Sequence, residues 1–306
     1  MDKVVLCIAH KSPELINALI QQLLVDASGC TDIYLHIDKK SDNIKSKIIE
    51  HPNVHFIQNN HSITWGDESN VEMLVDCFRE IVSHGKHYDY FQICTGQDLM
   101  IRPGLDRFLE NNKGKIYISI QKNDNYIKNL VTHYYPRCFR KDLTGNPFLS
   151  VLELAYTLLT RTGIVPRKKI DYDVDRVDFY HSYNWSFMPY ETLCYIDRFL
   201  GENPGFMTIY QNCRLPEDAF LGTLIRNSPY RDCVAFREGS QRGNSLTYRR
   251  PIKGYHIPVL TMKDLPEIDK SENYMGRKFD MDVDSEIVEL LKRRVCGENT
   301  ITSRES

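Results

Sequence analysis

The chain has 306 residues, a length that fits one large domain or one domain with a substantial insertion. Hydrophobic residues make up 42% of it and aromatic residues 11%, so the chain can bury a full core and we do not expect it to be disordered. A formal net charge of only -2 argues against nucleic acid as a partner, because nucleic-acid-binding chains carry a basic footprint.

Cysteine usage and hydropathy bear on the compartment. Nine cysteines are scattered without a Cys-x-x-Cys pair, so neither a zinc site nor a disulfide framework is indicated, and we interpret them as buried thiols in a reducing compartment. No apolar run approaches the ~18 residues of a transmembrane helix, and the strand-like segment that follows Met1 does not resemble a signal peptide. We therefore expect a cytoplasmic protein. The basic clusters Arg137–Lys141 and Arg167–Lys169 favour a solvated face, with peripheral contact at the inner face of the plasma membrane as the alternative.

The first 120 residues alternate strand-like and helix-like segments. The expected strands are Val4–Ala9, Asp32–Asp38, Val54–Gln58, Tyr88–Cys94 and Lys115–Ile120. The expected helices are Ser12–Val25, a short helix between the second and third strands, Glu68–His84 and Gly104–Asn111. This alternation predicts a three-layer α/β domain with a mainly parallel, Rossmann-like central sheet. Ligands bind beyond the carboxyl ends of such strands, which here indicates His10, Asp38 and the Thr95–Asp98 turn.

The middle of the chain, 121–183, is less regular and rich in Tyr, Arg, Lys and His, with one helix expected near Leu149–Thr162. Alternation resumes with a strand at Asn184–Pro189, a helix at Tyr190–Leu200 and a helix after Pro216, and the chain closes with a helix at Glu286–Val295. We expect a single domain whose parts are 1–120, 121–183 and 184–306.

Two adjacent carboxylates, Glu217 and Asp218, follow Pro216 and open an amphipathic run. Proline suits the first helical position, and acids in the first turn face the positive end of the helix dipole. Because the dipole favours the ionised carboxylate, a base placed there is expected to be deprotonated at neutral pH. The simpler interpretation is that such acids only stabilise the helix.

Other motifs are informative by their absence or position. There is no Gly-x-Gly-x-x-Gly, P-loop or Gly-x-Ser-x-Gly motif, which argues against dinucleotide, P-loop and α/β-hydrolase sites. The Asp-x-Asp runs at Asp173–Asp175 and Asp280–Asp284 do not follow apolar strands, so we interpret both as structural, the second as a cap of the last helix. Without a metal, side chains must neutralise a departing diphosphate, and Arg277 and Lys278 are the candidates.

Several stretches, in one order and over nearly the whole chain except about 121–180, resemble one family. The chain resembles the core-2/I-branching β-1,6-N-acetylglucosaminyltransferases and peptide O-xylosyltransferases, glycosyltransferase family 14, in a short bacterial type. The matching stretches are Ile8–Lys11, Tyr34–Lys40, Trp65–Ser69, Tyr88–Phe91, Thr95–Asp98, Asn184–Phe187, Pro216–Thr223, Asn227–Pro229 and Arg277–Asp280.

The resemblance implies a GT-A-type fold and an inverting, metal-independent mechanism without a cofactor. The base, a glutamate five residues before a threonine in the family, falls on Asp218, with Glu217 as the alternative because the acid pair looks swapped. The diphosphate-binding pair falls on Arg277 and Lys278. For an arginine that some members carry upstream of that pair, Arg249, Arg250 or Lys253 are substitutes here.

The remaining implied site residues concern the two substrates. The resemblance assigns donor contacts to His10, Asp38, Gly96, Gln97 and Asp98, and it assigns Trp185 to the acceptor side. It implies transfer of N-acetylglucosamine or another hexose from a UDP-sugar to a hydroxyl of a glycan or lipid-linked oligosaccharide, giving a β linkage, in bacterial surface polysaccharide synthesis.

Two alternatives stay open. One is a metal-dependent glycosyltransferase that uses Asp280, Asp282 and Asp284. The other is a non-catalytic subunit that binds a sugar nucleotide, which the swapped acid pair motivates.

Overall fold

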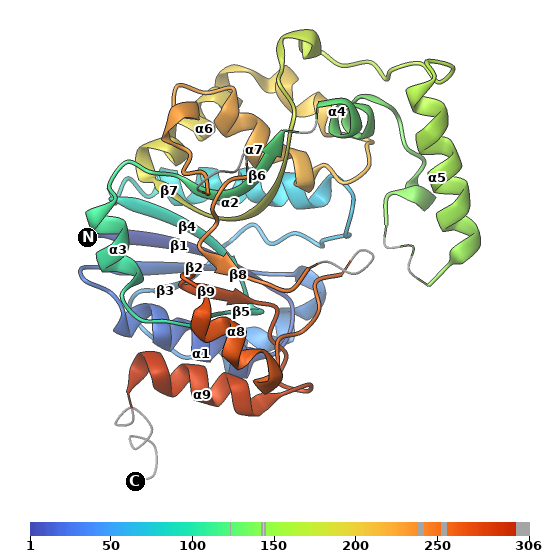
Figure 1. Ribbon diagram of the computed structural model, residues 1–306. Coiled ribbons are helices and arrows are strands. Elements are labelled where there is room, and N and C mark those ends of the chain that lie inside the picture. The colour runs from blue at the N-terminus through green and yellow to red at the C-terminus, as the bar shows by residue number, and fades with distance from the viewer. Residues whose placement is uncertain (123, 142, 144, 238–241, 252–255, 298–306) are drawn as a thin grey trace.

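A six-stranded sheet forms the centre of the molecule, with the strand order β3-β2-β1-β4-β7-β6 (Figure 1). The computed structural model describes residues 1–122, 124–141, 143, 145–237, 242–251 and 256–297. The strands are β1 (Lys3–Ala9), β2 (Thr31–Ile37), β3 (Val54–Phe56), β4 (Tyr90–Thr95), β6 (Tyr117–Lys122) and β7 (Tyr180–Pro189). The first four run parallel, whereas β7 runs antiparallel to both β4 and β6.

Helices cover both faces of the sheet and make a three-layer molecule (Figure 1). On one face lie α1 (Pro13–Val25) and α9 (Ser285–Cys296), and on the other lie α2 (Ser69–Ser83), α6 (Tyr190–Glu202) and α7 (Glu217–Arg226). Side chains of β1 alternate between the two cores, because successive residues of a strand point to opposite faces. Val4 and Leu6 enter the core with α2 and α7, whereas Val5 and Cys7 enter the core with α1 and α9.

A small second sheet brings the last third of the chain to the carboxyl end of β4. It consists of β5 (Asp98–Met100), β9 (Met275–Arg277) and β8 (Thr247–Tyr248) in the order β5-β9-β8. In the antiparallel pairing of β5 with β9, Asp98 lies opposite Arg277. This pairing places the basic pair beside the turn that follows β4.

The remaining helices lie at the periphery. They are α3 (Leu105–Asn111), α4 (Asp124–Thr132), α5 (Pro147–Arg161) and α8 (Leu265–Lys270). Short 3-10 turns are η1 (Lys39–Lys47), η2 (Arg137–Phe139), η3 (Val174–Arg176), η4 (Pro204–Ile209), η5 (Arg231–Cys233) and η6 (Met262–Asp264). In Figure 1, α5 lies at the edge of the molecule, beyond α4 and away from the central sheet.

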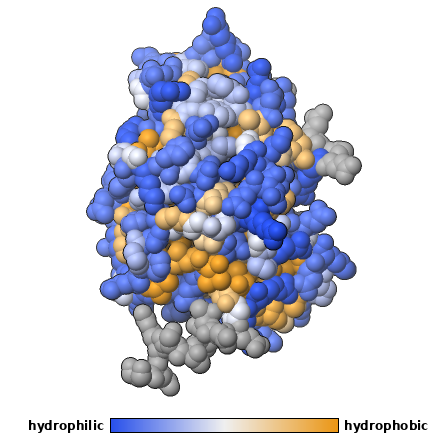
Figure 2. Space-filling view, turned by 90° about the vertical axis from the view of Figure 1, so that its left-hand side faces the viewer, coloured by the Kyte–Doolittle hydropathy of each residue, from blue (hydrophilic) through white to orange (hydrophobic). Residues whose placement is uncertain are grey.

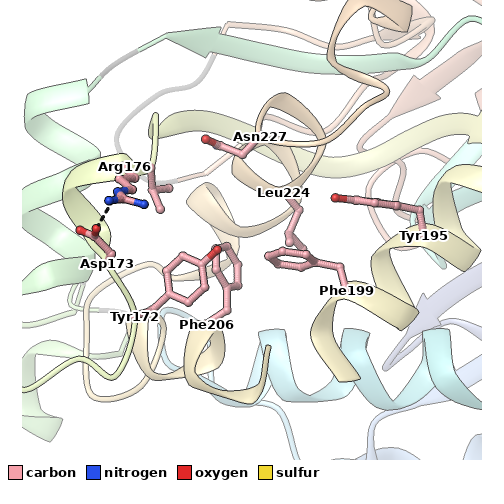
Figure 3. Close-up of a pocket in the computed structure, with 9 residues that line it drawn as sticks. Tyr172, Asp173, Arg176, Tyr195, Phe199, Phe206, Leu224 and Asn227 are labelled. Carbon is pink, nitrogen blue, oxygen red and sulfur yellow. Dashed lines mark ion pairs between the residues drawn. The ribbon is translucent and has the colours of Figure 1, made fainter. Parts of the chain in front are cut away.

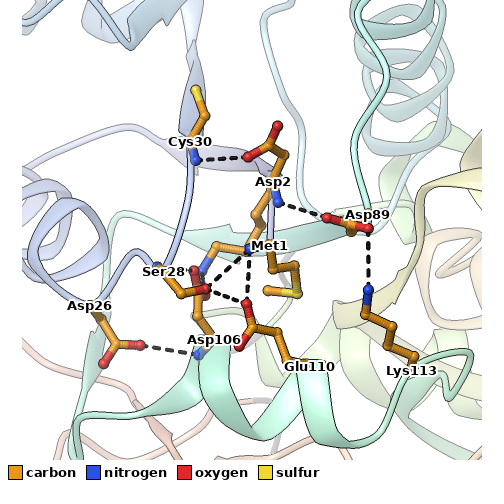
Figure 4. Close-up of polar contacts among 10 residues, drawn as sticks. Met1, Asp2, Asp26, Ser28, Cys30, Asp89, Asp106, Glu110 and Lys113 are labelled. Atoms are coloured by element: carbon orange, nitrogen blue, oxygen red, sulfur yellow. Dashed lines mark hydrogen bonds and ion pairs between the residues drawn. The ribbon is translucent and has the colours of Figure 1, made fainter.

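Polar contacts tie α3 to the start of β1 (Figure 4). The ammonium of Lys3 and the carboxylate of Asp106 form a fully buried ion pair. Asp26, just after α1, accepts hydrogen bonds from the backbone N–H groups of Gly104 and Asp106, and Glu110 pairs with the Met1 ammonium at 2.9 Å. Such buried charges need partners, and here the pairs fix α3 against the sheet.

The predicted fold class is confirmed: the protein is a mixed α/β fold with a mainly parallel central sheet. The small sheet and α4 went unpredicted, and β7 begins at Tyr180 rather than at Asn184. The expectation that the cysteines are buried is wrong for Cys138, which is exposed. Within the described residues, no helix has the length and apolarity required to cross a membrane. The face shown in Figure 2 is largely hydrophilic, with a smaller apolar area in its lower half.

Candidate active site

The start of α7 is held against β7 by close contact of small residues. Gly222 lies so near the strand that a Cβ there would be 2.6 Å from the Ser182 side chain. Its backbone N–H donates to Ser182 Oγ at 2.9 Å, and the N–H of Tyr180 donates to Thr223 Oγ1 at 3.2 Å. As a result Asp218, in the first turn of α7, lies next to His181 of β7, with 3.7 Å between Oδ2 and Nε2.

The two acids of α7 have different surroundings. The Asp218 side chain is 27% exposed and borders the aromatic side chains of β7. The Glu217 carboxylate is buried: Oε1 accepts the Gly66 N–H at 3.2 Å, and Oε2 has no hydrogen-bond partner among the described residues. Burial and the neighbouring Asp218 raise the pKa of Glu217 to about 8. The expectation that the helix dipole keeps this carboxylate ionised is therefore wrong for Glu217, because desolvation outweighs the dipole.

The loop that contacts Glu217 is the Trp65-Gly66 stretch. Gly66 has φ +86°, and a Cβ there would meet the Arg214 guanidinium at 2.6 Å. The Gly66 carbonyl accepts the Leu215 N–H at 3.1 Å, and the Arg214 guanidinium lies 5.3 Å from the Trp65 ring centroid. Only glycine combines this backbone conformation with so close an approach. This loop therefore holds the segment that leads into α7.

A row of three rings runs along β7 at every second residue. His181 packs edge-on against Tyr183 at 5.0 Å, and Tyr183 stacks on Trp185 at 4.4 Å with the planes 9° apart. The period of two places the three side chains on one face of the strand. The ring row therefore leads from Asp218 at one end to Trp185 at the other.

Arg277 lies at the far end of this ring row. Its guanidinium carbon is 3.9 Å from the centroid of the Trp185 ring, and its Nη1 is 3.1 Å from Asp98 Oδ1. Asp98 also accepts hydrogen bonds from the backbone N–H and the hydroxyl of Thr95. Burial raises the pKa of Asp98, and the charge of Arg277 opposes that rise. The Arg277 guanidinium is therefore held by the Asp98 carboxylate at one nitrogen and by the Trp185 ring.

Further cations gather beside Arg277. Burial lowers the pKa of Lys278, and the charges of Lys11 and Arg277 lower it further. Lys11 forms an ion pair of 2.7 Å with Asp280. Burial and the nearby Lys278 and Lys11 also lower the pKa of His10, at the end of β1. The lowered pKa values show that these neighbouring cations repel one another. A bound anion would relieve this repulsion, so the cluster favours anion binding.

The structure distinguishes the three substitutes for the upstream arginine. The Arg249 guanidinium lies 5.2 Å from the Tyr183 ring centroid, over the ring row. Arg250 instead pairs with Asp264 through two nitrogens, and Lys253 lies outside the described residues. Arg249 also lines a cavity of about 470 Å³ together with Arg237 and Arg242. The described lining of this cavity contains no Asp or Glu, so it is a basic cavity.

Like Asp98, three further expected donor residues already have contacts inside the protein. Asp38 caps η1 by accepting the Lys40 N–H at 2.9 Å, and it also accepts the Ile63 N–H. Gly96 packs so closely on β1 and α1 that a Cβ would be 2.8 Å from Ala9 and 2.9 Å from Ile16. Gln97 donates to the Phe279 carbonyl. Asp38, Gly96 and Gln97 therefore contact other parts of the protein, whereas Arg277 and Lys278 carry the cationic groups of the site.

The acidic runs have structural contacts. Asp284 caps α9 by accepting the Ile287 N–H, as predicted, and Asp280 accepts from Lys11 and from the Asp282 N–H. Asp173 caps η3. Among the described residues, no three His, Cys, Asp or Glu side chains lie close enough together to ligate an ion.

A second cavity lies at the opposite end of α7 from Asp218 (Figure 3). Its volume is about 280 Å³, and its lining is largely aromatic, with Tyr172, Tyr195, Phe199 and Phe206 around Leu224. None of the predicted site residues lines it. It is separate from the candidate active site.

Sequence reasoning missed His181, Tyr183 and Lys11. The alternation of ring side chains over His181, Tyr183 and Trp185 carried a strand signal that the shorter predicted strand did not include. Lys11 belongs to the first matching stretch, but its ion pair with Asp280 joins residues far apart in the sequence and could not be predicted.

Comparison with known proteins gives limited similarity. No protein-family profile matches the chain. A stretch of 92 residues, 28% of the chain, is 26% identical to the xylosyltransferase oxt of Drosophila melanogaster, and the chain spans about a tenth of the length of this relative.

Two solved structures are similar at low TM-scores. One is a Bacillus anthracis protein described as a candidate glucose-1-phosphate thymidylyltransferase in complex with sucrose, at TM-score 0.30 and 10% identity over 64% of this chain and 74% of that one. The other is a variant UDP-glucose pyrophosphorylase of Leishmania major, at TM-score 0.32 and 10% identity over 66% of this chain and 52% of that one. Similarity at this level carries no argument about function.

Proposed function

We propose that the protein is a metal-independent, inverting glycosyltransferase that moves a sugar from a UDP-sugar to a hydroxyl of a glycan. One observation carries the proposal: Asp218 and Arg277 lie at opposite ends of one row of rings on β7. A base at one end and a fixed cation at the other are the two charges that glycosyl transfer to a hydroxyl needs. The partial similarity to a xylosyltransferase supports the same class of reaction.

In this mechanism Asp218 is the general base. As the acceptor hydroxyl attacks the anomeric carbon, its proton passes to Asp218, and the bond between that carbon and the diphosphate oxygen breaks with its electron pair leaving on the diphosphate. Attack from the face opposite the nucleotide inverts the centre, so an α-linked donor gives a β linkage. Asp218 is favoured over Glu217 because its carboxylate is partly exposed beside the ring row, whereas the Glu217 carboxylate is buried behind the Gly66 loop.

Arg277 and Lys278 neutralise the departing diphosphate. Arg277 is fixed between Asp98 and Trp185, so it needs no reorganisation as charge develops. Lys11 and Arg249 add positive charge on either side. A side-chain cation cluster can do the work that a divalent ion does in other transferases, and this supports a reaction that runs without a metal.

The substrates follow from the same arrangement. The uridine is proposed to bind beyond β1 and β2, next to His10 and Asp38, where doubly wound sheets take their ligands. The sugar, N-acetylglucosamine or another hexose, is then proposed to lie between the Asp218 carboxylate and the Arg277 guanidinium, beside the ring row of β7. A glycan or lipid-linked oligosaccharide acceptor in bacterial surface polysaccharide synthesis completes the proposal.

The test is turnover of UDP-, GDP- and CDP-sugars in excess EDTA, with glycan acceptors and product linkage read by NMR. We expect chelator-resistant turnover of one UDP-sugar, lost at least about a hundredfold in Asp218→Asn and Lys278→Ala. The matched control is Asp282→Asn, which removes an acid of the Asp280–Asp284 run and should leave activity unchanged.

Three outcomes would overturn parts of the proposal. Activity that needs manganese and is lost in Asp282→Asn would identify a metal-dependent enzyme. Full activity in Asp218→Asn would reject Asp218 as the base and favour Glu217. Donor binding without turnover, with every acceptor tried, would identify a non-catalytic subunit.

A further inference from the structure

Helix α5 buries polar side chains and exposes apolar ones. Its buried side chains are polar: Glu153, Thr157 and Thr160 are each less than a tenth exposed. The apolar side chains of the same helix point to the surface. The apolar face of α5 consists of Phe148, Val151, Leu152, Leu154, Leu158 and Leu159, which are 41–70% exposed.

The spacing of these residues is that of a helix face made for burial. Phe148, Val151 and Leu152 are related by three and four residues, and Leu158 and Leu159 continue the stripe two turns later. In soluble helices such a stripe faces the core, and a contiguous exposed apolar patch marks a contact surface. The apolar face of α5 is therefore a surface for contact with something outside the chain.

The helix cannot present its polar side outward without losing specific bonds. Glu153 Oε1 accepts a hydrogen bond from Thr157 Oγ1 at 2.9 Å and lies 3.7 Å from the guanidinium of Arg214. The Tyr135 hydroxyl and Thr157 Oγ1 are 3.0 Å apart, in hydrogen-bond contact. At the start of the helix, the Asn146 side chain accepts the Leu149 N–H at 3.0 Å. The bond between Thr157 and Glu153 and the Asn146 cap lie within the helix, whereas the contacts of Glu153 with Arg214 and of Thr157 with Tyr135 reach other segments and fix which side faces the protein.

Charge identifies the partner. Residues 133–169, which contain α5 and its flanks, hold seven Lys or Arg. Of these, Arg140 is buried in an ion pair with Glu68, and Arg167 and Lys169 pair with Asp175 and Asp171. Arg137 and Lys141 before the helix, and Arg161 and Lys169 at and after its end, are exposed. An apolar helix face flanked by cations is the pattern of helices that lie in the interface of an anionic membrane.

We propose that α5 docks the protein on the surface of a bilayer that contains anionic lipid, with its apolar face among the acyl chains and the flanking cations at the headgroups. A protein partner would be expected to meet a rim of mixed charge, whereas the exposed side chains of Arg137, Lys141 and Arg161 at the two ends of α5 are all cationic. The membrane contact is independent of the proposed sugar transfer, and vesicle binding can be measured without any substrate.

The experiment is co-sedimentation of the full chain with phosphatidylcholine vesicles, with and without phosphatidylglycerol. We expect binding that requires phosphatidylglycerol, weakens as salt is added, and falls about tenfold or more in the double variant Leu152→Gln/Leu159→Gln. The matched control is Val25→Gln/Val283→Gln, which changes two exposed apolar residues elsewhere and should bind like the parent. Circular dichroism and Tm confirm that both variants fold.

A charge variant separates the two parts of the contact. Arg137→Glu/Lys141→Glu should lower binding to phosphatidylglycerol vesicles while the fold and Tm are unchanged. Absence of sedimentation with either vesicle, or equal loss in the Val25/Val283 control, would overturn the proposal. So would a concentration-dependent dimer that dissociates in Leu152→Gln/Leu159→Gln, because a second copy of the chain would then cover the apolar face.

Discussion

The guanidinium carbon of Arg277 lies 3.9 Å from the centroid of the Trp185 ring, and its Nη1 lies 3.1 Å from Oδ1 of Asp98. Arg277 is thus fixed on two sides by residues from β5 and β7, which belong to different sheets. This geometry suits a planar guanidinium and does not suit a flexible ammonium group.

Replacing Arg277 by lysine should therefore lower kcat/KM for the donor by about a hundredfold, although the charge is kept, because an ammonium group cannot cover the Trp185 ring as a guanidinium does while it contacts Asp98. Steady-state kinetics with varied UDP-sugar would measure the effect. Arg198→Lys is the control. The Arg198 guanidinium lies 5.9 Å from the centroid of the Tyr195 ring, outside the candidate active site. Unchanged donor kinetics in Arg277→Lys would show that Arg277 acts only as a point charge.

Asp98→Ala should destabilise the protein by about 3 kcal/mol, because it removes both the buried partner of Arg277 and the acceptor of the two Thr95 hydrogen bonds. Urea unfolding followed by fluorescence would measure the change in the free energy of unfolding. In the exposed pair of Lys270 with Glu267, the control Glu267→Gln should cost less than about 1 kcal/mol. Equal losses in the two variants would mean that the buried pair is no more important than a surface pair.

Glu217 should make stability fall as the pH rises. Its pKa is about 8 in the folded protein against an ordinary value of 4.5, so between these values the folded state keeps a proton that the unfolded chain has lost. The stabilisation is complete below pH 4.5 and is lost as the pH rises through 8.

The measurement is urea unfolding at pH 6.5 and pH 8 for the parent and for Glu217→Gln. The parent should lose on the order of 1 kcal/mol more than the variant over this window. The window avoids His36, whose pKa burial lowers from 6.5 to about 4, so that its titration destabilises the fold only below pH 6.5. Identical pH dependence in the two proteins would contradict a raised pKa at Glu217.

Gly222→Ala should destabilise the protein by about 1–3 kcal/mol, because the added methyl group would meet Ser182 at 2.6 Å and push α7 from β7. The same shift should move Asp218 away from His181 and lower kcat. Gly201→Ala in α6 is the matched control: nothing lies within 4 Å of its Cβ position, and alanine in a helix should stabilise by up to about 1 kcal/mol. A neutral Gly222→Ala would mean that the helix and strand can separate without cost.

The architecture could be predicted from the residues because it depends on local patterns. Apolar runs such as Val4–Ala9 and periodic segments such as Ser12–Val25 have their own signals, and they matched β1 and α1 closely. The acid pair of α7 and the basic pair Arg277-Lys278 were also visible as residue types that suit the chemistry.

What each of those residues touches could not be predicted, because it depends on contacts between distant segments. The stack of Arg277 on Trp185 arises from the pairing of β5 with β9, two strands too short to leave a pattern. The pKa of Glu217 depends on its burial against the Gly66 loop, whereas the sequence indicated only the helix dipole. The outward apolar face of α5 also depends on distant segments. The periodicity of its residues predicts a helix but does not say which side is buried. In the fold, Arg214 contacts Glu153 and Tyr135 contacts Thr157, so the polar side is the buried one. Periodicity is a property of a segment, whereas burial and pairing are properties of the whole fold.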